Sequence, residues 1–164
     1  MEFTLACRDD LPEIVSLFDA ATKHMDANGI HQWDAIYPNR QILLEDIDQG
    51  ILQLGIVDGQ IAVVFVLEEC DEADYEEADW CVHADRIIVL HRLCVHPAFQ
   101  GRGIARAAMD YLEQAVRERG ICTIRLDAFS QNPTALRLYE TRGYRKAGEI
   151  TYRKGLFYLY EKLL

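Results

Sequence analysis

The sequence predicts an α/β (α+β) fold in a single domain over residues 1–164, with a mixed, mostly antiparallel, twisted sheet and helices on both of its faces. Strand-like and helix-like patterns alternate along the chain in the order β-α-α-β-β-β-α-β-α-β-β. Asp58-Gly59 separates two apolar runs, which is a strong hairpin signal. A strand–helix–strand passage over residues 90–129 favours a right-handed crossover, so its two strands are expected to be parallel.

The first helix has recognisable signals at both ends, and it follows a short strand at Phe3–Leu5. Asp10 can cap the helix, and Glu13 completes a spacing like that of a capping box. Asn28-Gly29 is expected to end it, because glycine adopts the left-handed conformation of a helix C-cap. The predicted apolar face comprises Ile14, Leu17, Phe18, Ala21 and Met25.

A second helix is expected over Asn39–Asp48, and Gly50 closes it. Residues 52–57 and 61–67 then form the strands of the hairpin. The residues of the second helix expected to face inward are Ile42, Leu43 and Ile47.

Acidic residues are concentrated in one stretch. The formal net charge is −10, and residues 68–79 carry eight acids and no base, so the rest of the chain sums to −2. This stretch is expected to be a solvated loop. The overall charge argues against nonspecific binding to nucleic acid or to an anionic membrane.

The sequence has no segment that suggests export. No apolar run approaches the ~18–20 residues of a membrane span, and the N-terminus lacks a basic region followed by an apolar one. The five scattered cysteines include no C-x-x-C pair, which indicates reduced thiols in a cytoplasm and no metal site.

Residues 90–112, LHRLCVHPAFQGRGIARAAMDYL, read as a buried strand, a turn and an amphipathic helix. Pro97 ends the strand because proline cannot donate to the sheet ladder. Glycines in the turn allow a ligand to approach the backbone, and the N–H groups of a helix start favour an anion. The predicted phosphate-binding residues are Gln100, Gly101, Arg102, Gly103, Ile104 and Ala105. The predicted apolar helix face is Ile104, Ala108, Tyr111, Leu112 and Ala115.

The last part of the chain predicts one more strand, a short helix and an antiparallel pair. Ile121–Phe129 is the strand, and Asn132 caps the helix that Gly143 ends. Residues 144–152 and 156–163 then pair with each other.

Two motifs stand out: Gln100-x-x-Gly103-x-Ala105 after the central strand, and Asn132-Pro133-x-Ala135-x-x-Leu138-Tyr139-x-x-x-Gly143-Tyr144. Together they resemble the GCN5-related N-acetyltransferase (GNAT) family. The close matches cover about 55 residues. The resemblance implies acetyl-CoA as co-substrate and a central parallel strand pair that is splayed apart to admit its pantetheine arm.

The same resemblance implies roles for individual residues. The backbones of Leu93, Cys94 and Val95 would bind pantetheine, and one of their N–H groups would polarise the thioester carbonyl. Asn132 would bond the pantetheine amides, and Tyr139 would hydrogen-bond the departing thiolate or act as general acid. Plainer interpretations stand beside these: core packing for the strand side chains and Tyr139, and a helix cap for Asn132.

The general base and the acceptor site are less defined by the sequence. His91 is a candidate base, and Glu68 and Glu69 are further candidates in or near the acceptor site. Trp33 and Tyr37 lie in the loop between the first two helices, a region that lines the acceptor site in the family. The alternative is that the two aromatic rings fill a core edge.

The combined interpretation is an enzyme that moves an acetyl group directly from acetyl-CoA to a primary amine of a small molecule or peptide. The acidic stretch would attract a cationic amine. A non-catalytic CoA-binding module with the same fold is the alternative, and a thiol redox protein is disfavoured because no cysteine pair is placed for exchange. Neither nucleic acid nor membrane is an expected partner, and a homodimer is left open.

Overall fold

The computed structural model describes residues 1–70 and 78–164. They form two compact units whose segments interleave along the chain: residues 1–67 with 92–108 (unit 1), and residues 68–91 with 109–164 (unit 2). The strands are β1 (Glu2–Leu5), β2 (Leu52–Val57), β3 (Gln60–Cys70), β4 (Ile87–Val95), β5 (Thr123–Phe129), β6 (Arg145–Tyr152) and β7 (Gly155–Leu163). The helices are α1 (Leu11–Ala27), α2 (Arg40–Asp48), α3 (Ile104–Glu118) and α4 (Pro133–Thr141), with short 3-10 turns η1 (Arg8–Asp10) and η3 (Pro97–Phe99).

The strands follow the sheet order β1-β2-β3-β4-β5-β7-β6, and β4 pairs with β5 in parallel through Ile88–Leu90 and Ile124–Leu126. The predicted parallel pair is therefore confirmed. Antiparallel pairing joins β1 to β2, β2 to β3, β5 to β7 and β7 to β6. The final hairpin thus inserts its second strand beside β5 and leaves β6 at the edge. The predicted mixed, mostly antiparallel sheet is confirmed, whereas the splay of β4 from β5 stays a prediction.

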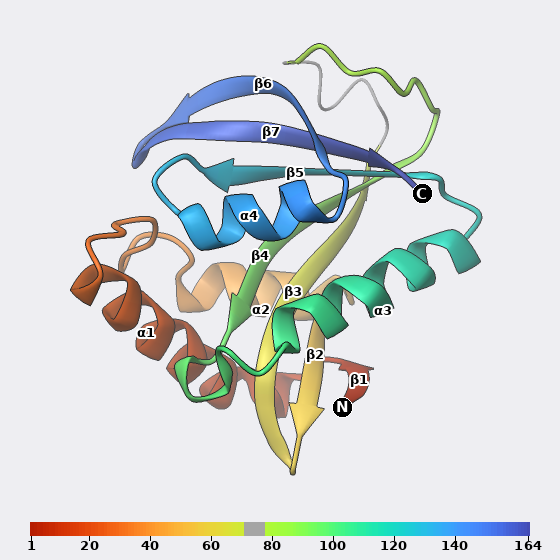
Figure 1. The fold of residues 1–164 in the computed structure, drawn as a ribbon. Helices are drawn as coiled ribbons and strands as arrows, with labels where there is room; N and C mark the ends of the chain where they lie inside the picture. Colours follow the sequence, from red (N-terminus) through yellow and green to blue (C-terminus); the bar gives the residue numbers. More distant parts are fainter. Residues whose placement is uncertain (71–77) are drawn as a thin grey trace. The chain divides into compact units, whose positions relative to one another are not determined.

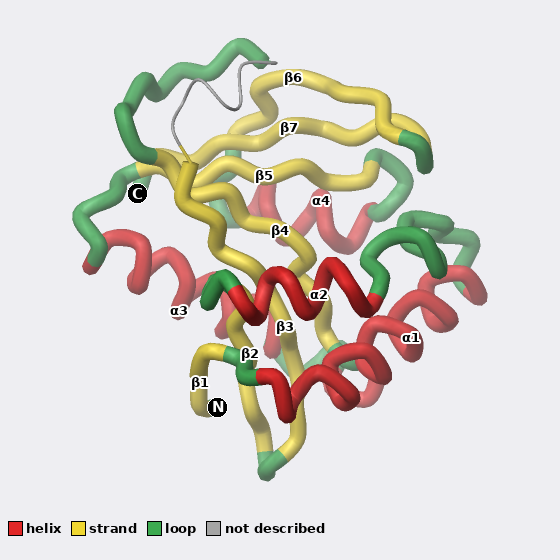
Figure 2. The backbone as a smooth tube through the Cα atoms, turned by 180° about the vertical axis from the view of Figure 1, so that it is seen from behind, coloured by secondary structure: helices red, strands yellow, loops and turns green. Residues whose placement is uncertain are grey.

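In unit 1, α1 and α2 contact each other and lie against β2 and β3 (Figure 2). The apolar faces predicted for both helices supply this core, although Met25 and Ile42 are only half-buried. Each fully buried Leu or Ile side chain contributes roughly 1.5–3 kcal/mol. The buried core includes Ile14, Leu17, Phe18, Ala21, Leu43, Ile47, Leu52, Leu54, Val64, Val66 and Cys94.

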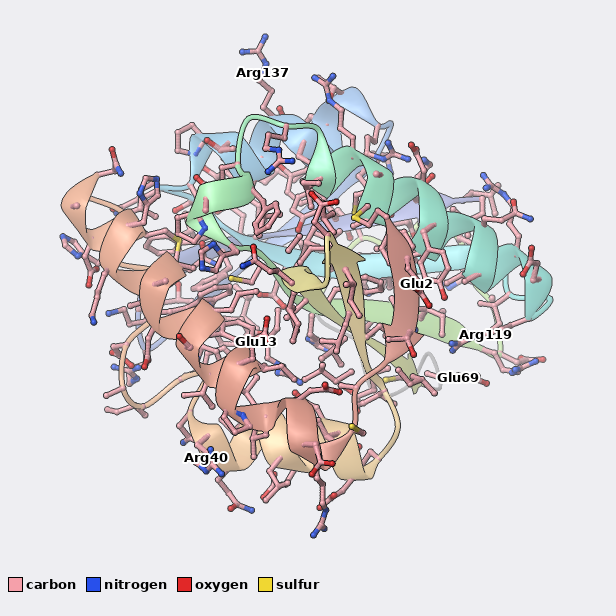
Figure 3. The ribbon with its side chains drawn as sticks, turned by 90° about the horizontal axis from the view of Figure 1, so that it is seen from below. Glu2, Glu13, Arg40, Glu69, Arg119 and Arg137 are labelled. Carbon is pink, nitrogen blue, oxygen red and sulfur yellow. The ribbon has the colours of Figure 1, made fainter. Side chains whose placement is uncertain are left out.

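The predicted capping box at the start of α1 is wrong. Asp10 has helical backbone angles as the last residue of the η1 turn and makes no side-chain cap bond to α1; its carboxylate accepts the N–H of Cys7 at 2.8 Å. Glu13, labelled on α1 in Figure 3, accepts the N–H of Ile61 at 3.0 Å. A tertiary bond to β3 has therefore replaced the local one, and it fixes the start of α1 against the hairpin.

The predicted hairpin is confirmed, with φ of 51° at Asp58 and 77° at Gly59, as a type I′ turn requires. However, β3 continues to Cys70, so Glu68 and Glu69 belong to a strand and not to a loop. Residues 71–77 of the acidic stretch lie outside the described residues.

In unit 2, α4 lies beside β5, which pairs along its length with β7 (Figure 1). Arg125 of β5 is fully buried, and its guanidinium lies 4.2 Å from the ring centroid of Trp80 and donates to the carbonyl of Val82 at 2.8 Å. Glu161 of β7 accepts the N–H groups of Cys81 and Val82. The segment before β4 is thus bound to this sheet by charged groups.

The predicted face of α3 is partly wrong. Ala108 and Leu112 are completely buried, but Tyr111 and Ala115 are only half-buried. The buried face of the helix is rotated relative to the predicted one, and it includes the charged residue Glu113. The other completely buried residues of α3 are Met109 and Val116.

Candidate functional site

In unit 1, β4 is distorted at Arg92, whose φ is 54° although it has a side chain. This left-handed conformation costs a residue with a Cβ roughly 1–2 kcal/mol. The strand continues through Leu93, Cys94 and Val95. The Cys94 side chain lies in the core, and burial raises the pKa of its thiol, so the thiol is neutral. The Cys94 thiol is therefore not available to a ligand.

Two residues far away in sequence hold the Arg92 side chain. Its Nη2 lies 2.7 Å from Oδ1 of Asp46 in α2, and its Nη1 donates to the hydroxyl of Tyr37 at 2.8 Å. Burial lowers the pKa of the guanidinium, but Tyr37 and Asp46 outweigh that effect and raise it, so Arg92 stays charged. Neither Arg92 nor Asp46 was predicted from the sequence as a site residue. The available signal was an acid between Leu43 and Ile47 on the inward face of the second helix.

The turn after β4 contains two glycines with left-handed backbones, φ 73° at Gly101 and φ 79° at Gly103. A Cβ added at either glycine would meet no atom within 4 Å, so open space borders both. The side-chain amide of Gln100 donates to the carbonyl of Val95 at 3.4 Å, and the guanidinium of Arg102 lies 4.9 Å from the ring centroid of Phe99.

Helix α3 begins directly after this turn, and the N–H of Ala107 donates to the carbonyl of Gly103 at 3.1 Å. The N–H groups of residues 104–106 precede that first helical bond, so they point out of the helix end. The strand, turn and helix predicted over residues 90–112 are therefore confirmed. The open space beside the glycines and the positive end of the helix dipole fit a phosphate group.

In unit 2, Asn132 caps α4, because its Oδ1 accepts the N–H of Ala135 at 3.2 Å. Tyr139 lies on this helix and is buried, with its ring 5.7 Å from that of Tyr144 and 6.2 Å from that of Tyr160. Burial raises the pKa of the Tyr139 phenol, and the charge of Asp127 raises it further. Tyr139 therefore keeps its proton and can donate it in a hydrogen bond.

The residues of unit 2 predicted as candidate bases each have a charged partner. His91 Nε2 lies 3.1 Å from Oε2 of Glu68, with the imidazole mostly buried. Arg86 donates to Glu69 at 2.6 Å, and this bond holds the pKa of the Glu69 carboxyl below its usual range. Arg119 adds to that effect (Figure 3). Glu69 is therefore a weak base, whereas Glu68 is placed to orient His91.

The two aromatic residues of the loop in unit 1 differ from each other. Trp33 is buried and packs against Phe18 at a ring distance of 5.2 Å, which agrees with the alternative that this ring fills a core edge. Tyr37 is 37% exposed and its neighbour Ile36 is 62% exposed. The Arg92 guanidinium lies 5.8 Å from the Tyr37 ring centroid, so that ring already contacts a cation.

Within residues 1–70 and 78–164, no group of three or more His, Cys, Asp or Glu side chains is placed to hold a metal ion. In the same part of the chain, no helix has the length and apolarity needed to cross a membrane.

The model of the Acetyltransferase (GNAT) family matches residues 41–144. The ribosomal protein bS18-alanine N-acetyltransferase of Escherichia coli is 33% identical over 58 residues, which are 35% of this chain and 39% of that protein. The match thus spans about two fifths of that curated relative.

Two solved structures extend the similarity to nearly the whole chain. A GNAT-family acetyltransferase from Streptococcus agalactiae has a TM-score of 0.86 at 26% identity, with 99% of this chain and 95% of that chain covered. The PaiA N-acetyltransferase of Thermoplasma acidophilum, solved in complex with coenzyme A, has a TM-score of 0.74 at 18% identity, with coverages of 99% and 98%. The second resemblance is one of fold alone.

Proposed function

Because the chain belongs to the acetyltransferase (GNAT) family, we propose that it transfers the acetyl group of acetyl-CoA directly to a primary amine of a small molecule or peptide. The observation that carries the proposal is the turn from β4 into α3, with two left-handed glycines, open space beside them and unbonded helix-start N–H groups. The amine nitrogen would attack the thioester carbon, a C–N bond would form, and the C–S bond would break. The amine would lose a proton and the thiolate would gain one.

We assign the phosphate end of acetyl-CoA to the turn in unit 1. The N–H groups of Gly101, Gly103 and residues 104–106 would bind the pyrophosphate, with Gln100 and Arg102 beside them. The backbones of Leu93, Cys94 and Val95 would pair with pantetheine, and one N–H would stabilise the negative charge that develops on the carbonyl oxygen.

We assign the sulfur side of the reaction to unit 2. Tyr139 would donate a hydrogen bond to the departing thiolate. Its raised pKa makes complete proton transfer to a thiolate unfavourable, because an ordinary thiol has a pKa of about 8.5. Stabilisation by the hydrogen bond is therefore the favoured role. Asn132 would bond the pantetheine amides through its side-chain nitrogen while its oxygen caps α4.

We assign the general base to His91, with Glu68 orienting its ring. The base must take its proton from the ammonium form of the amine, so the rate should fall when His91 is protonated at low pH. In His91→Gln the acidic limb of the pH profile of kcat/KM should disappear. An unchanged acidic limb in this variant would assign that limb to another group.

The acceptor is proposed only as a primary amine. Attraction of cations by residues 68–79 stays a prediction, since 71–77 lie outside the described residues and Glu69 is paired with Arg86. Trp33 is not assigned a contact with a cationic acceptor, because its ring is buried. Location in the cytoplasm and assembly into a homodimer likewise stay predictions. Light scattering of the purified protein would test for the homodimer.

Binding and transfer together test the proposed function. Calorimetry measures acetyl-CoA affinity, and mass spectrometry follows acetylation of hexylamine, spermidine and a hexapeptide with an N-terminal alanine. The peptide enters the panel because the E. coli relative is an alanine N-acetyltransferase. Binding with neither transfer nor release of free CoA would favour the non-catalytic module, and absence of binding would exclude both.

Gly103→Glu should weaken acetyl-CoA binding at least ~10-fold, which requires only ~1.4 kcal/mol. The substitution places a side chain and a negative charge where the pyrophosphate is proposed to lie. Gly120→Glu is the matched control, because Gly120 lies at the other end of α3, has φ 71° and also borders open space. Equal calorimetric affinities of the two folded variants would contradict the phosphate assignment.

A further inference from the structure

Arg92 joins three segments of unit 1 through one guanidinium. Its backbone has a left-handed φ of 54° inside β4, and such strain persists only where the surroundings hold it. Asp46 of α2 and Tyr37 of the preceding loop supply that hold through bonds of 2.7 and 2.8 Å. The distorted part of strand β4 at Arg92 and the loop before α2 are therefore connected to each other.

The Tyr37 bond goes beyond what charge compensation requires. Asp46 is itself buried and forms a close ion pair with Arg92, so it already balances the charge. Tyr37, in contrast, is 37% exposed and follows the exposed Ile36. The Tyr37 hydroxyl connects the buried arginine to a surface loop. The Tyr37 ring is still partly exposed, so its burial contributes little to stability.

Hydrogen bonds to Asp34 hold the backbone of the same loop around Tyr37. The Oδ1 atom of Asp34 accepts the N–H of Ile36 at 3.0 Å and the N–H of Tyr37 at 3.2 Å. The Tyr37 carbonyl in turn accepts the N–H of Asp34 at 3.0 Å. These bonds connect the backbone of Tyr37 to Asp34 and Ile36, so we expect a displacement of the Tyr37 backbone to move this part of the loop together with the exposed side chain of Ile36.

We propose that the loop of residues 30–39, the region to which the family resemblance assigns the acceptor, is held by Arg92 against the part of β4 that acts on the thioester. Arg92 is then a positioning residue, and acceptor binding depends on the Arg92–Tyr37 hydrogen bond. The inference rests on the proposed function, which assigns Leu93, Cys94 and Val95 to acetyl-CoA. Arg92 acts through the loop and through its own strained backbone, and it does not itself touch the reacting atoms.

Tyr37→Phe tests the link, because it removes one hydroxyl and keeps the ring. KM for the best acceptor among hexylamine, spermidine and the alanine peptide should rise about 3- to 10-fold, as expected for loss of one hydrogen bond of ordinary net strength. The kcat value and the acetyl-CoA affinity should stay within about twofold of wild type. Tyr152→Phe, on exposed β6 of unit 2, is the matched control.

Hydrogen exchange supplies a readout that does not depend on activity. Amide exchange over residues 34–39 should accelerate about 3- to 10-fold in Tyr37→Phe and in Arg92→Lys, because a lysine ammonium has a single nitrogen and lacks the fork that reaches both partners. Exchange over α4 should be unchanged in both variants.

Faster loop exchange together with a higher acceptor KM supports the proposal. Unchanged exchange overturns it, and so does faster exchange with an unchanged acceptor KM, since the link would then not serve acceptor binding. Failure of the proposed function appears separately, as a wild-type protein that acetylates no member of the amine panel.

Discussion

Replacing Tyr139 with phenylalanine should lower the turnover of acetyl transfer about 10²- to 10⁴-fold, the usual contribution of a group that donates to a reacting atom. Acetyl-CoA affinity should change little, because the proposed hydrogen bond forms to a thiolate that exists only as the C–S bond breaks. Single-turnover kinetics with saturating acetyl-CoA measure the chemical step directly.

The physical basis is the environment of the phenol. Tyr139 is buried on α4, and burial raises its pKa, so its hydroxyl stays protonated across the range in which an enzyme of this kind would work. The substitution preserves the ring and its contacts with Tyr144 and Tyr160. Loss of activity would therefore report the missing hydroxyl and not a cavity.

Tyr144→Phe provides the control for this prediction. Tyr144 belongs to the same cluster of rings, is also buried, and likewise has a pKa raised by burial. Its variant should retain turnover within a few-fold of wild type. If Tyr139→Phe matches Tyr144→Phe in single-turnover rate, Tyr139 has no catalytic role.

Glu113→Gln should lower the free energy of unfolding by about 3–5 kcal/mol, the range for removal of one partner from a buried ion pair. Glu113 is buried on α3, and its carboxylate accepts hydrogen bonds from Arg142 Nε at 3.1 Å and from Lys162 Nζ at 2.8 Å. Both cations are themselves largely buried. The amide keeps the volume but removes the negative charge, so Lys162 loses this carboxylate and Arg142 keeps only its bond to the exposed Asp110. The folded state therefore loses more than it would from removal of an exposed ion pair.

Asp110 supplies a matched control on the same helix. It bonds the same arginine, with Oδ1 2.7 Å from Arg142 Nη2, but its side chain is 69% exposed. Asp110→Asn should therefore cost only about 0–1 kcal/mol, as exposed ion pairs do. Urea denaturation of the three proteins measures both effects. An equal decrease in the free energy of unfolding for Glu113→Gln and Asp110→Asn would show that burial does not determine how much each ion pair with Arg142 contributes.

Local signals carried most of the predictable structure. Asp58-Gly59 fixes a hairpin because both residues accept positive φ, and the strands on either side confirm it. Asn132 bonds an N–H three residues later, and Gly101 and Gly103 shape the turn before α3. In each case the determining contacts lie within a few residues, so the sequence pattern contains both partners.

Pairing along the sheet was only partly predictable. The crossover through α3 predicted the parallel strands β4 and β5, because handedness and connection length leave few choices. The position of β7 between β5 and β6 had no such signal. A two-stranded hairpin can join a sheet through either of its strands, and the packing of both of its faces selects one.

What the sequence by itself determined was the set of elements, their turns and the two motifs, since each follows from backbone preference and short-range spacing. Only the tertiary structure decided which polar groups are buried. Arg92 meets Tyr37 and Asp46 across 55 and 46 residues, and Glu13 meets Ile61 across 48. Trp33 likewise packs in the core although it lies in a polar loop. A charge or a ring enters the interior only where a distant segment supplies its partner, and short-range spacing does not contain that partner.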